Sequence, residues 1–185
     1  MKFVHLHVNS HYSLLDGLTK IDELISVAKE DGAEAIALTD HGVMYGAIEF
    51  YQKCKKAGIK PIIGVEAYLA PNSRHDKITK ADESNYYHLI LLVKNIEGYK
   101  NLIKLTTLAN LEGFYYRPRV DWEILEKYHN GLIAMTACLG GEIPHLILAG
   151  KMEKAKKRIK EYNDLFGQGN FYLEIQSHPE LEKQD

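Results

Sequence analysis

Short apolar segments and amphipathic segments alternate along almost the whole chain, and this alternation constrains the possible folds most strongly. The apolar segments indicate buried strands, and the segments between them repeat apolar residues at helical spacing. We expect strands at residues 3–8, 34–39, 60–69, 86–93, 131–136 and 171–176. This pattern predicts an α/β fold in which parallel strands are joined by right-handed helical crossovers. An open doubly wound sheet and a closed barrel both satisfy it.

Side chains that bind metals occur at nearly every expected strand end. In both α/β architectures ligands bind outside the carboxyl ends of the strands, so these positions are candidate site residues. They are His5, His7, Asp16, Asp40, His41, Glu66, His88, Cys138, Glu174 and His178. Imidazole, carboxylate and thiolate groups hold borderline divalent ions such as zinc. The pattern therefore predicts a metal cluster that bridges a phosphate and activates water near neutral pH.

Most of these residues have a purely structural interpretation when each is taken alone. His88 opens an apolar segment and is typical of a hydrogen-bonded core residue, whereas Asp40 is typical of a turn. Cys138 alone is typical of a small buried residue. Glu66 differs, because a carboxylate in a buried strand must be paired or bound to a cation. We assign no function to the remaining loop and helix-surface histidines, which are His75, His129 and His145.

Other features narrow the classes of function. The sequence has no Gly-x-Gly-x-x-Gly after a strand and no Walker-type phosphate loop. A nucleophilic pair of Cys138 with a histidine stays open, because the spacing selects no partner. With 23 basic and 25 acidic residues the formal net charge is −2, which disfavours a chain that wraps nucleic acid by charge alone.

Several absences favour a cytoplasmic protein without a membrane partner. No apolar run approaches the ~20 residues that span a bilayer, and the start of the sequence has no signal-peptide pattern. Two cysteines form no disulfide framework, which fits a reducing compartment.

Residues 114–119 combine three aromatic residues with two arginines. This composition suits stacking on bases or binding of phosphates. It is equally typical of an exposed loop with ordinary packing aromatics. Both interpretations stay open.

Four segments carry a distinctive residue pattern, and they occur at residues 5–17, 38–42, 64–68 and 136–141. Together with residues 114–121 they resemble the PHP (polymerase and histidinol phosphatase) domain family, in the version at the N-terminus of bacterial DNA polymerase III alpha subunits. The resemblance covers residues 1–185 as one domain. It implies a distorted (β/α)7, TIM-like barrel that lacks its last strand in this chain.

The resemblance also implies a set of site residues. The metal ligands would be His7, Asp16, His41, Glu66, His88 and Cys138, and the first four would act in catalysis. The implied cofactor is a divalent metal, with zinc preferred over manganese or magnesium and up to three ions in the complete domain. Glu66 would suit the bridging of two ions, and we expect Asp40 to orient His41.

Two departures from the family pattern bear on activity. Asn9 stands at a position where the family has a histidine ligand, and His5 is then a neighbour or a substitute ligand. The family's last motif, an Asp-x-His, does not occur before Asp185. His178 is a further open ligand candidate.

The function implied is that of the N-terminal PHP domain of a replicative DNA-directed DNA polymerase, a nucleotidyltransferase of DNA replication. Within this chain the implied activity is a metal-dependent 3′–5′ exonuclease or phosphoesterase. The implied partners are primer-template DNA, through the parent polymerase, and other replicase subunits such as the proofreading subunit. Two alternatives stay open: a non-catalytic structural or interaction module, and a free-standing PHP-family phosphatase.

Overall fold

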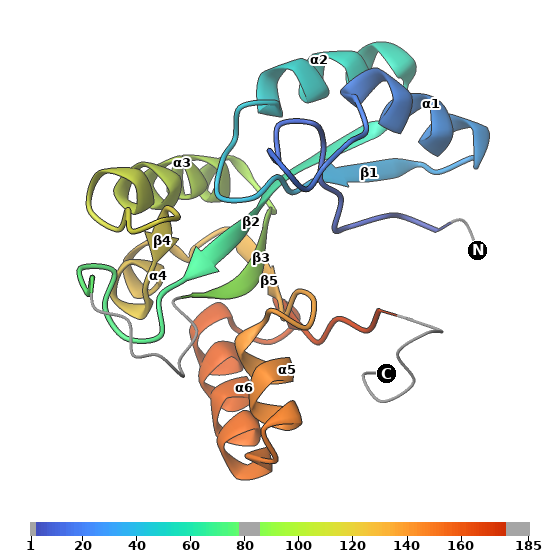
Figure 1. The fold of residues 1–185 in the computed structure, drawn as a ribbon. Helices are drawn as coiled ribbons and strands as arrows, with labels where there is room; N and C mark the ends of the chain where they lie inside the picture. Colours follow the sequence, from blue (N-terminus) through green and yellow to red (C-terminus); the bar gives the residue numbers. More distant parts are fainter. Residues whose placement is uncertain (1–2, 78–85, 177–185) are drawn as a thin grey trace.

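The structure is a computed structural model that describes residues 3–77 and 86–176 of the 185-residue chain. Helices and strands alternate along it (Figure 1). The helices are α1 (Ile21–Glu30), α2 (Ala47–Ala57), α3 (Ile96–Leu111), α4 (Trp122–Tyr128), α5 (Glu142–Leu148) and α6 (Met152–Phe166). The strands are β1 (Ala35–Leu38), β2 (Lys60–Leu69), β3 (Tyr87–Val93), β4 (Arg119–Val120), β5 (Leu132–Met135) and β6 (Phe171–Tyr172). The predicted α/β alternation is confirmed.

The strands form a mixed sheet in the order β1-β2-β3-β5-β6, with β4 beside β2. β1 and β4 run parallel to β2, and β6 runs parallel to β5. β3 runs antiparallel to both β2 and β5, so the expectation that all strands are parallel is wrong for β3. The described residues between β2 and β3 form no helix. A parallel neighbour would require a crossover of a dozen or more residues, usually a helix, and the described part of this connection contains none.

The expected strand at residues 3–8 is not a strand. The segment runs beside β1, where the carbonyls of His5 and Val8 accept hydrogen bonds from the N–H groups of Ala37 and Thr39 (2.9 and 2.8 Å). The Val8 N–H donates instead to the side-chain oxygen of Thr39 (2.8 Å), which interrupts the backbone ladder. At the other end of the chain β6 is shorter than the expected strand at 171–176.

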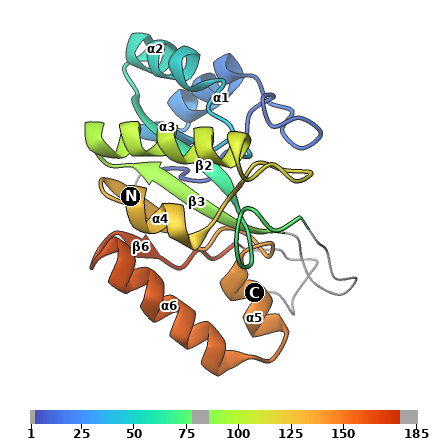
Figure 2. The same cartoon turned by 90° about the vertical axis from the view of Figure 1, so that its left-hand side faces the viewer.

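Alternation along the strands separates the two faces of the sheet. Val65, Ala67 and Leu69 of β2 point into the larger core, together with alternate residues of β3 and β5. Helices α3, α4, α5 and α6 complete this core, and Figure 2 shows α3, α4 and α6 along the sheet. A second core lies between β1, α1 and α2 around Ile25 and Phe50. None of the described helices is both long and apolar enough to cross a membrane.

The opposite face of β2, β3 and β5 has two chemically different halves. Near the carboxyl end of β2 it presents Glu66 and His88. Further along it presents Ile90, Leu92 and Met135, which belong to a small apolar cluster. This apolar half borders a cavity of about 1180 Å³ that extends between residues 3–7 and 172–176. The fold therefore gathers polar groups at one end of a face that is otherwise apolar.

Candidate metal centre

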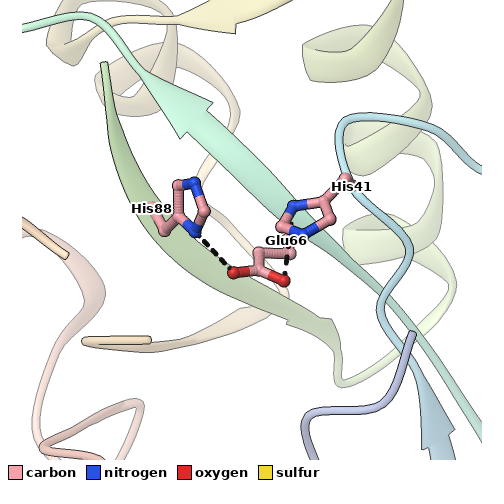
Figure 3. A group of neighbouring side chains, drawn as sticks. All are labelled: His41, Glu66 and His88. Atoms are coloured by element: carbon pink, nitrogen blue, oxygen red, sulfur yellow. Dashed lines mark hydrogen bonds and ion pairs between the residues drawn. The ribbon is translucent and has the colours of Figure 1, made fainter. Parts of the chain in front are cut away.

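Three side chains from different elements meet at the polar end of this face. His41 follows β1, Glu66 lies in β2 and His88 lies in β3 (Figure 3). Their ligand atoms all lie within 4.8 Å of one another. The carboxyl ends of β1 and β2 and the amino end of β3 form this edge, because β3 is antiparallel.

The carboxylate of Glu66 is the centre of the arrangement. It is 1% exposed, and its Oε1 accepts a hydrogen bond from His88 Nδ1 (2.7 Å). Its Oε2 accepts from His7 Nε2 and from the amide of Asn9, both at 2.9 Å, and lies 3.4 Å from His41 Nδ1. The prediction that a carboxylate at this position must be paired is confirmed.

Two of the histidines beside Glu66, His7 and His88, supply compensating charge. Burial alone would lower the pKa of His7, but its hydrogen bonds to Glu174 and Glu66 outweigh burial and raise the pKa to about 10. For His88, burial is likewise outweighed by the contacts with Cys138 and Glu66, and the pKa is raised to about 9. Burial alone would raise the pKa of Glu66, yet its bonds to His7 and His88 hold it far below the ordinary range. The folded chain thus surrounds a carboxylate with cations.

Asp16 and Cys138 complete the predicted ligand set from two loops. The Asp16 carboxylate accepts from His41 Nε2 (2.8 Å) and from the amide of Asn9 (3.2 Å), although its side chain is 57% exposed. Cys138 Sγ lies 3.5 Å from His88 Nδ1 and accepts from the Gly140 N–H (3.4 Å). Burial would raise the pKa of this thiol, but these two contacts outweigh it and lower the pKa.

We call His7, Asp16, His41, Glu66, His88 and Cys138 the ligand cluster. The structure brings all six to one edge of the sheet, although their positions span 132 residues of the sequence. Their role as metal ligands stays a prediction, as does the catalytic role of His7, Asp16, His41 and Glu66.

Asp40 is linked to the backbone of His41 through Ser13, and no direct contact with the His41 ring is seen among the described residues. Its buried carboxylate accepts from the N–H and hydroxyl of Ser10 and from the hydroxyl of Ser13 (2.7–3.1 Å). Ser13 in turn accepts from the His41 N–H (3.1 Å). Asp40 therefore fixes the backbone of the Ser10–Ser13 turn and of His41, while Asp16 contacts the imidazole.

Of the other expected strand-end residues, one joins the site and one does not. Glu174 accepts a hydrogen bond from His7 Nδ1 (2.7 Å) and another from the Gln176 amide (2.7 Å). His5 is exposed, and its ring packs against Phe3 at 4.8 Å rather than against the cluster. His178 lies outside the described residues.

Buried polar atoms without a hydrogen bond identify the same place. Within the described ranges four such atoms occur, and three of them belong to residues at this site: Asn9 Oδ1, His41 Nδ1 and Glu174 Oε2, the fourth being His11 Nδ1. Such atoms are rare in folded proteins and require an explanation. Nitrogen, oxygen and sulfur donors in this mixture suit a borderline divalent ion. The residues present therefore fit a divalent metal.

Comparison with known proteins gives a consistent result. The PHP domain family matches residues 5–178. The chain is 57% identical to the DNA polymerase III subunit alpha of Borreliella burgdorferi over 177 residues and 49% identical to that of Treponema pallidum over 178 residues. Each match covers 96% of this chain and 15% of the relative, so the chain spans about one seventh of the length of these proteins.

Similarity to solved structures is weaker. A two-domain protein from Bacteroides vulgatus, described as containing a predicted PHP-like metal-dependent phosphoesterase, is 18% identical with a TM-score of 0.44. The match covers 71% of this chain and 33% of that one. Similarity at this level supports no argument about function.

Proposed function

The chain belongs to the PHP domain family, and from this membership we propose that it is the N-terminal region of a bacterial DNA polymerase III alpha subunit. The parent protein would be a DNA-directed DNA polymerase, a nucleotidyltransferase that acts in DNA replication in the cytoplasm. The polymerase relatives at 57% and 49% identity support this assignment. They also disfavour a free-standing phosphatase, because the matching region is a small part of each relative.

Within this chain the proposed activity is metal-dependent hydrolysis of a phosphodiester, as in a 3′–5′ exonuclease. The ligand cluster would hold the ions, with Zn²⁺ preferred over Mn²⁺ or Mg²⁺ for its mixture of donors. When bound, such ions polarise a phosphoryl group and lower the pKa of water. Glu66, with two carboxylate oxygens at the centre of the cluster, would suit the bridging of two ions. His7 and His88 would first release their protons, because a metal ligand must be a neutral imidazole.

The observation that carries this proposal is the contact of the buried Glu66 carboxylate with three histidines. A buried ion pair gives a protein little stability compared with apolar packing. Three imidazoles around one carboxylate, with buried acceptor atoms left unpaired beside them, are better explained by a site for cations.

Elemental analysis of the purified chain tests the metal site. We expect bound divalent metal in the unmodified chain and a loss of most of it in Glu66→Gln, which keeps the side-chain volume and removes the charge. Glu30→Gln, at an exposed position of α1, is the matched control and should keep its metal. Equal metal content in all three proteins would refute the assignment.

A second candidate function is that of a non-catalytic structural or interaction module, and Asn9 favours it. Its amide nitrogen donates to both Glu66 and Asp16, so it links two expected ligands as a hydrogen-bond donor. Incubation of a 3′-labelled oligonucleotide with the chain and Mn²⁺ or Zn²⁺ separates the two functions. Hydrolysis that His41→Ala abolishes supports the phosphoesterase, and bound metal without hydrolysis supports the module.

We further propose that the sheet belongs to a distorted (β/α)7 barrel. The two ends of the sheet approach each other. Residues 3–8 run beside β1 at one end, and His7 in this segment is hydrogen-bonded to Glu174, which lies two residues beyond β6 at the other end. Primer-template DNA and other replicase subunits, such as the proofreading subunit, are the partners we propose on the basis of the polymerase relatives.

A further inference from the structure

Residues 113–119, which we call the aromatic loop, form a tight turn between α3 and β4. The Tyr115 N–H donates to the Arg117 carbonyl (3.0 Å), and the two residues pair as an isolated antiparallel bridge. Tyr116 at the tip has a φ of 58°, in the left-handed region that bulky residues rarely adopt. The turn therefore holds Tyr116 in an unfavourable backbone conformation that its surroundings must maintain.

The base of the aromatic loop is rigidly held by Arg119. This side chain is 3% exposed, and it donates to the carbonyls of Gly113, Arg74 and Asp76 (3.1, 3.0 and 2.6 Å). Its guanidinium also lies 5.2 Å from the centre of the Tyr115 ring. The backbone of the loop is thus held in place and needs little further ordering when a ligand binds.

The aromatic loop lies beside the ligand cluster. The Arg117 guanidinium lies 5.7 Å from the centre of the Tyr68 ring, and that ring is nearly parallel to the His41 imidazole at 5.5 Å. These distances place the guanidinium within about 11 Å of the His41 ring. Pro118 packs next to Gly42, because a Cβ added at Gly42 would lie 2.8 Å from the Pro118 side chain. Figure 2 shows the loop between α3 and β4 projecting on the same side as the loop after β2.

The side chains that the aromatic loop exposes are two rings and one cation. Phe114 is 54% exposed and Tyr116 is 73% exposed. Arg117 is exposed and makes no ion pair within the described part of the chain, whereas Arg74 and Arg158 both do. Exposed rings next to a free cation are the combination that binds single-stranded nucleic acid, with rings stacking on bases and cations contacting phosphates.

We propose that the aromatic loop binds the single-stranded DNA next to the phosphodiester that reacts at the ligand cluster. Arg117 contacts a backbone phosphate, and Tyr116 and Phe114 stack on the neighbouring bases. The inference rests on the proposed phosphoesterase function and names its substrate as a single-stranded DNA end. Stacking on tyrosine and phenylalanine predicts binding with little sequence preference. The net charge of −2 favours such a local contact over binding through an extended basic surface.

Fluorescence anisotropy with a labelled single-stranded oligonucleotide tests the loop directly, in chelator so that the metal site does not contribute. Tyr116→Ala should weaken binding at least about fivefold, because base stacking is worth about 1–3 kcal/mol per base. Tyr116→Phe keeps the ring and should retain the affinity. Arg117→Ala should lower the slope of log affinity against log salt by about 0.7, the value for one lost phosphate contact.

Two exposed positions supply matched controls, and both should bind as the unmodified chain does. Lys154→Ala removes one positive charge from α6, and Tyr51→Ala removes one half-exposed ring from α2. Circular dichroism confirms that each variant is folded. Unchanged affinity in Tyr116→Ala and Arg117→Ala, or no binding by the unmodified chain, overturns the inference. If the affinity is unchanged in both variants, the exposed rings are better explained as a contact for another protein. Tighter binding to the RNA of the same sequence would overturn the choice of DNA.

Failure of this inference is distinguishable from failure of the proposed function. Metal content and hydrolysis of bis(p-nitrophenyl) phosphate by the unmodified chain test the ligand cluster without any base to stack. A chain that holds metal and hydrolyses this diester, but binds DNA equally well without Tyr116 or Arg117, refutes the loop assignment alone. A chain without metal or hydrolysis, whose DNA binding still depends on these two residues, refutes the phosphoesterase and retains the DNA contact.

Discussion

Two clusters of charged side chains are buried in this chain, and they are completed in different ways. The first is the ligand cluster. The second, which we call the anchor cluster, consists of Arg74, Arg119 and Asp121 with the more exposed Glu112 and Glu123. Arg74 donates to both oxygens of Asp121 (3.0 and 3.1 Å), to Glu112 (2.8 Å) and to Glu123 (3.0 Å). Asp121 also accepts from the Ile124 N–H at the start of α4 (3.2 Å).

The difference between the clusters indicates their roles. The anchor cluster combines two arginines, which are always charged, with carboxylates, and none of its members has a buried side-chain nitrogen or oxygen without a partner among the described residues. The ligand cluster uses histidines, which are not always charged, and three buried polar atoms in and around it have no hydrogen-bond partner among the described residues. A cluster that is already complete holds loops together, whereas an incomplete one can still take up a cation. Four predictions test this comparison.

The largest effect is expected in the anchor cluster. Asp121→Ala removes the carboxylate that pairs with the buried Arg74 and caps α4, and it should lower the free energy of unfolding by about 3 kcal/mol or more. Urea denaturation measures this loss. Asp164→Ala removes an exposed partner of Lys160 and should change stability by no more than about 0.5 kcal/mol. Equal costs at both positions would contradict a structural role for the anchor cluster.

Metal addition should stabilise the folded chain through the ligand cluster only. At a free Zn²⁺ concentration of about 100 times Kd, the folded chain should gain about 2.7 kcal/mol. For a chain of this size that corresponds to a rise in Tm of about 5–10 °C. Differential scanning calorimetry should show no such rise for Glu66→Gln, whereas Asp121→Ala should keep the full increment on its lower baseline. A metal-induced rise that survives Glu66→Gln would place the ion elsewhere.

A smaller effect is expected from pH in the metal-free chain. The pKa values of His7 and His88, about 10 and about 9, lie above the ordinary value of 6.5, so their protonation stabilises the folded state. That contribution is complete below pH 6.5 and is lost as the pH rises through 9 and 10. We expect Tm to fall by several degrees over this range, and to fall less in the double variant His7→Gln/His88→Gln. Parallel curves for the two proteins would refute this linkage.

The smallest effect is expected at Asn9. Asn9→His restores an imidazole at the position where the PHP pattern has one, next to Glu66 and Asp16. An imidazole is a better ligand for borderline divalent ions than an amide, so metal affinity should rise a few-fold. Competition with a chromogenic chelator measures the change. Asn163→His, on α6, is the control and should leave the affinity unchanged.

The predictable part of the fold is the part that depends on local periodicity. The strands Lys60–Leu69 and Tyr87–Val93 occur where the sequence places them, to within one residue. The extended segment at residues 3–8 was less predictable, because its apolar residues resemble a strand. Its backbone pairing with β1 is interrupted at Thr39, because the Thr39 hydroxyl oxygen accepts the hydrogen bond of the Val8 N–H.

The candidate site was predictable to a similar degree. All six ligand-cluster residues were identified from residue type and family pattern, but their hydrogen bonds were not. The contact of His7 with Glu174 joins positions 167 residues apart, and no local pattern encodes it. The role of Asp40 was assigned from its neighbour His41, whereas the carboxylate actually reaches Ser10 and Ser13. Adjacency in sequence is a poor guide to which side chain a carboxylate contacts.

The sequence by itself determined most of the alternation of strands and helices, the occurrence of side chains of metal-ligand type at the strand ends and the membership of the PHP family. Only the tertiary structure decided how His88 reaches Glu66. His88 stands at the start of β3, and in an all-parallel sheet it would lie at the edge opposite Glu66. Because β3 runs antiparallel to β2, its amino end lies at the carboxyl end of β2, and the imidazole of His88 reaches the Glu66 carboxylate at 2.7 Å.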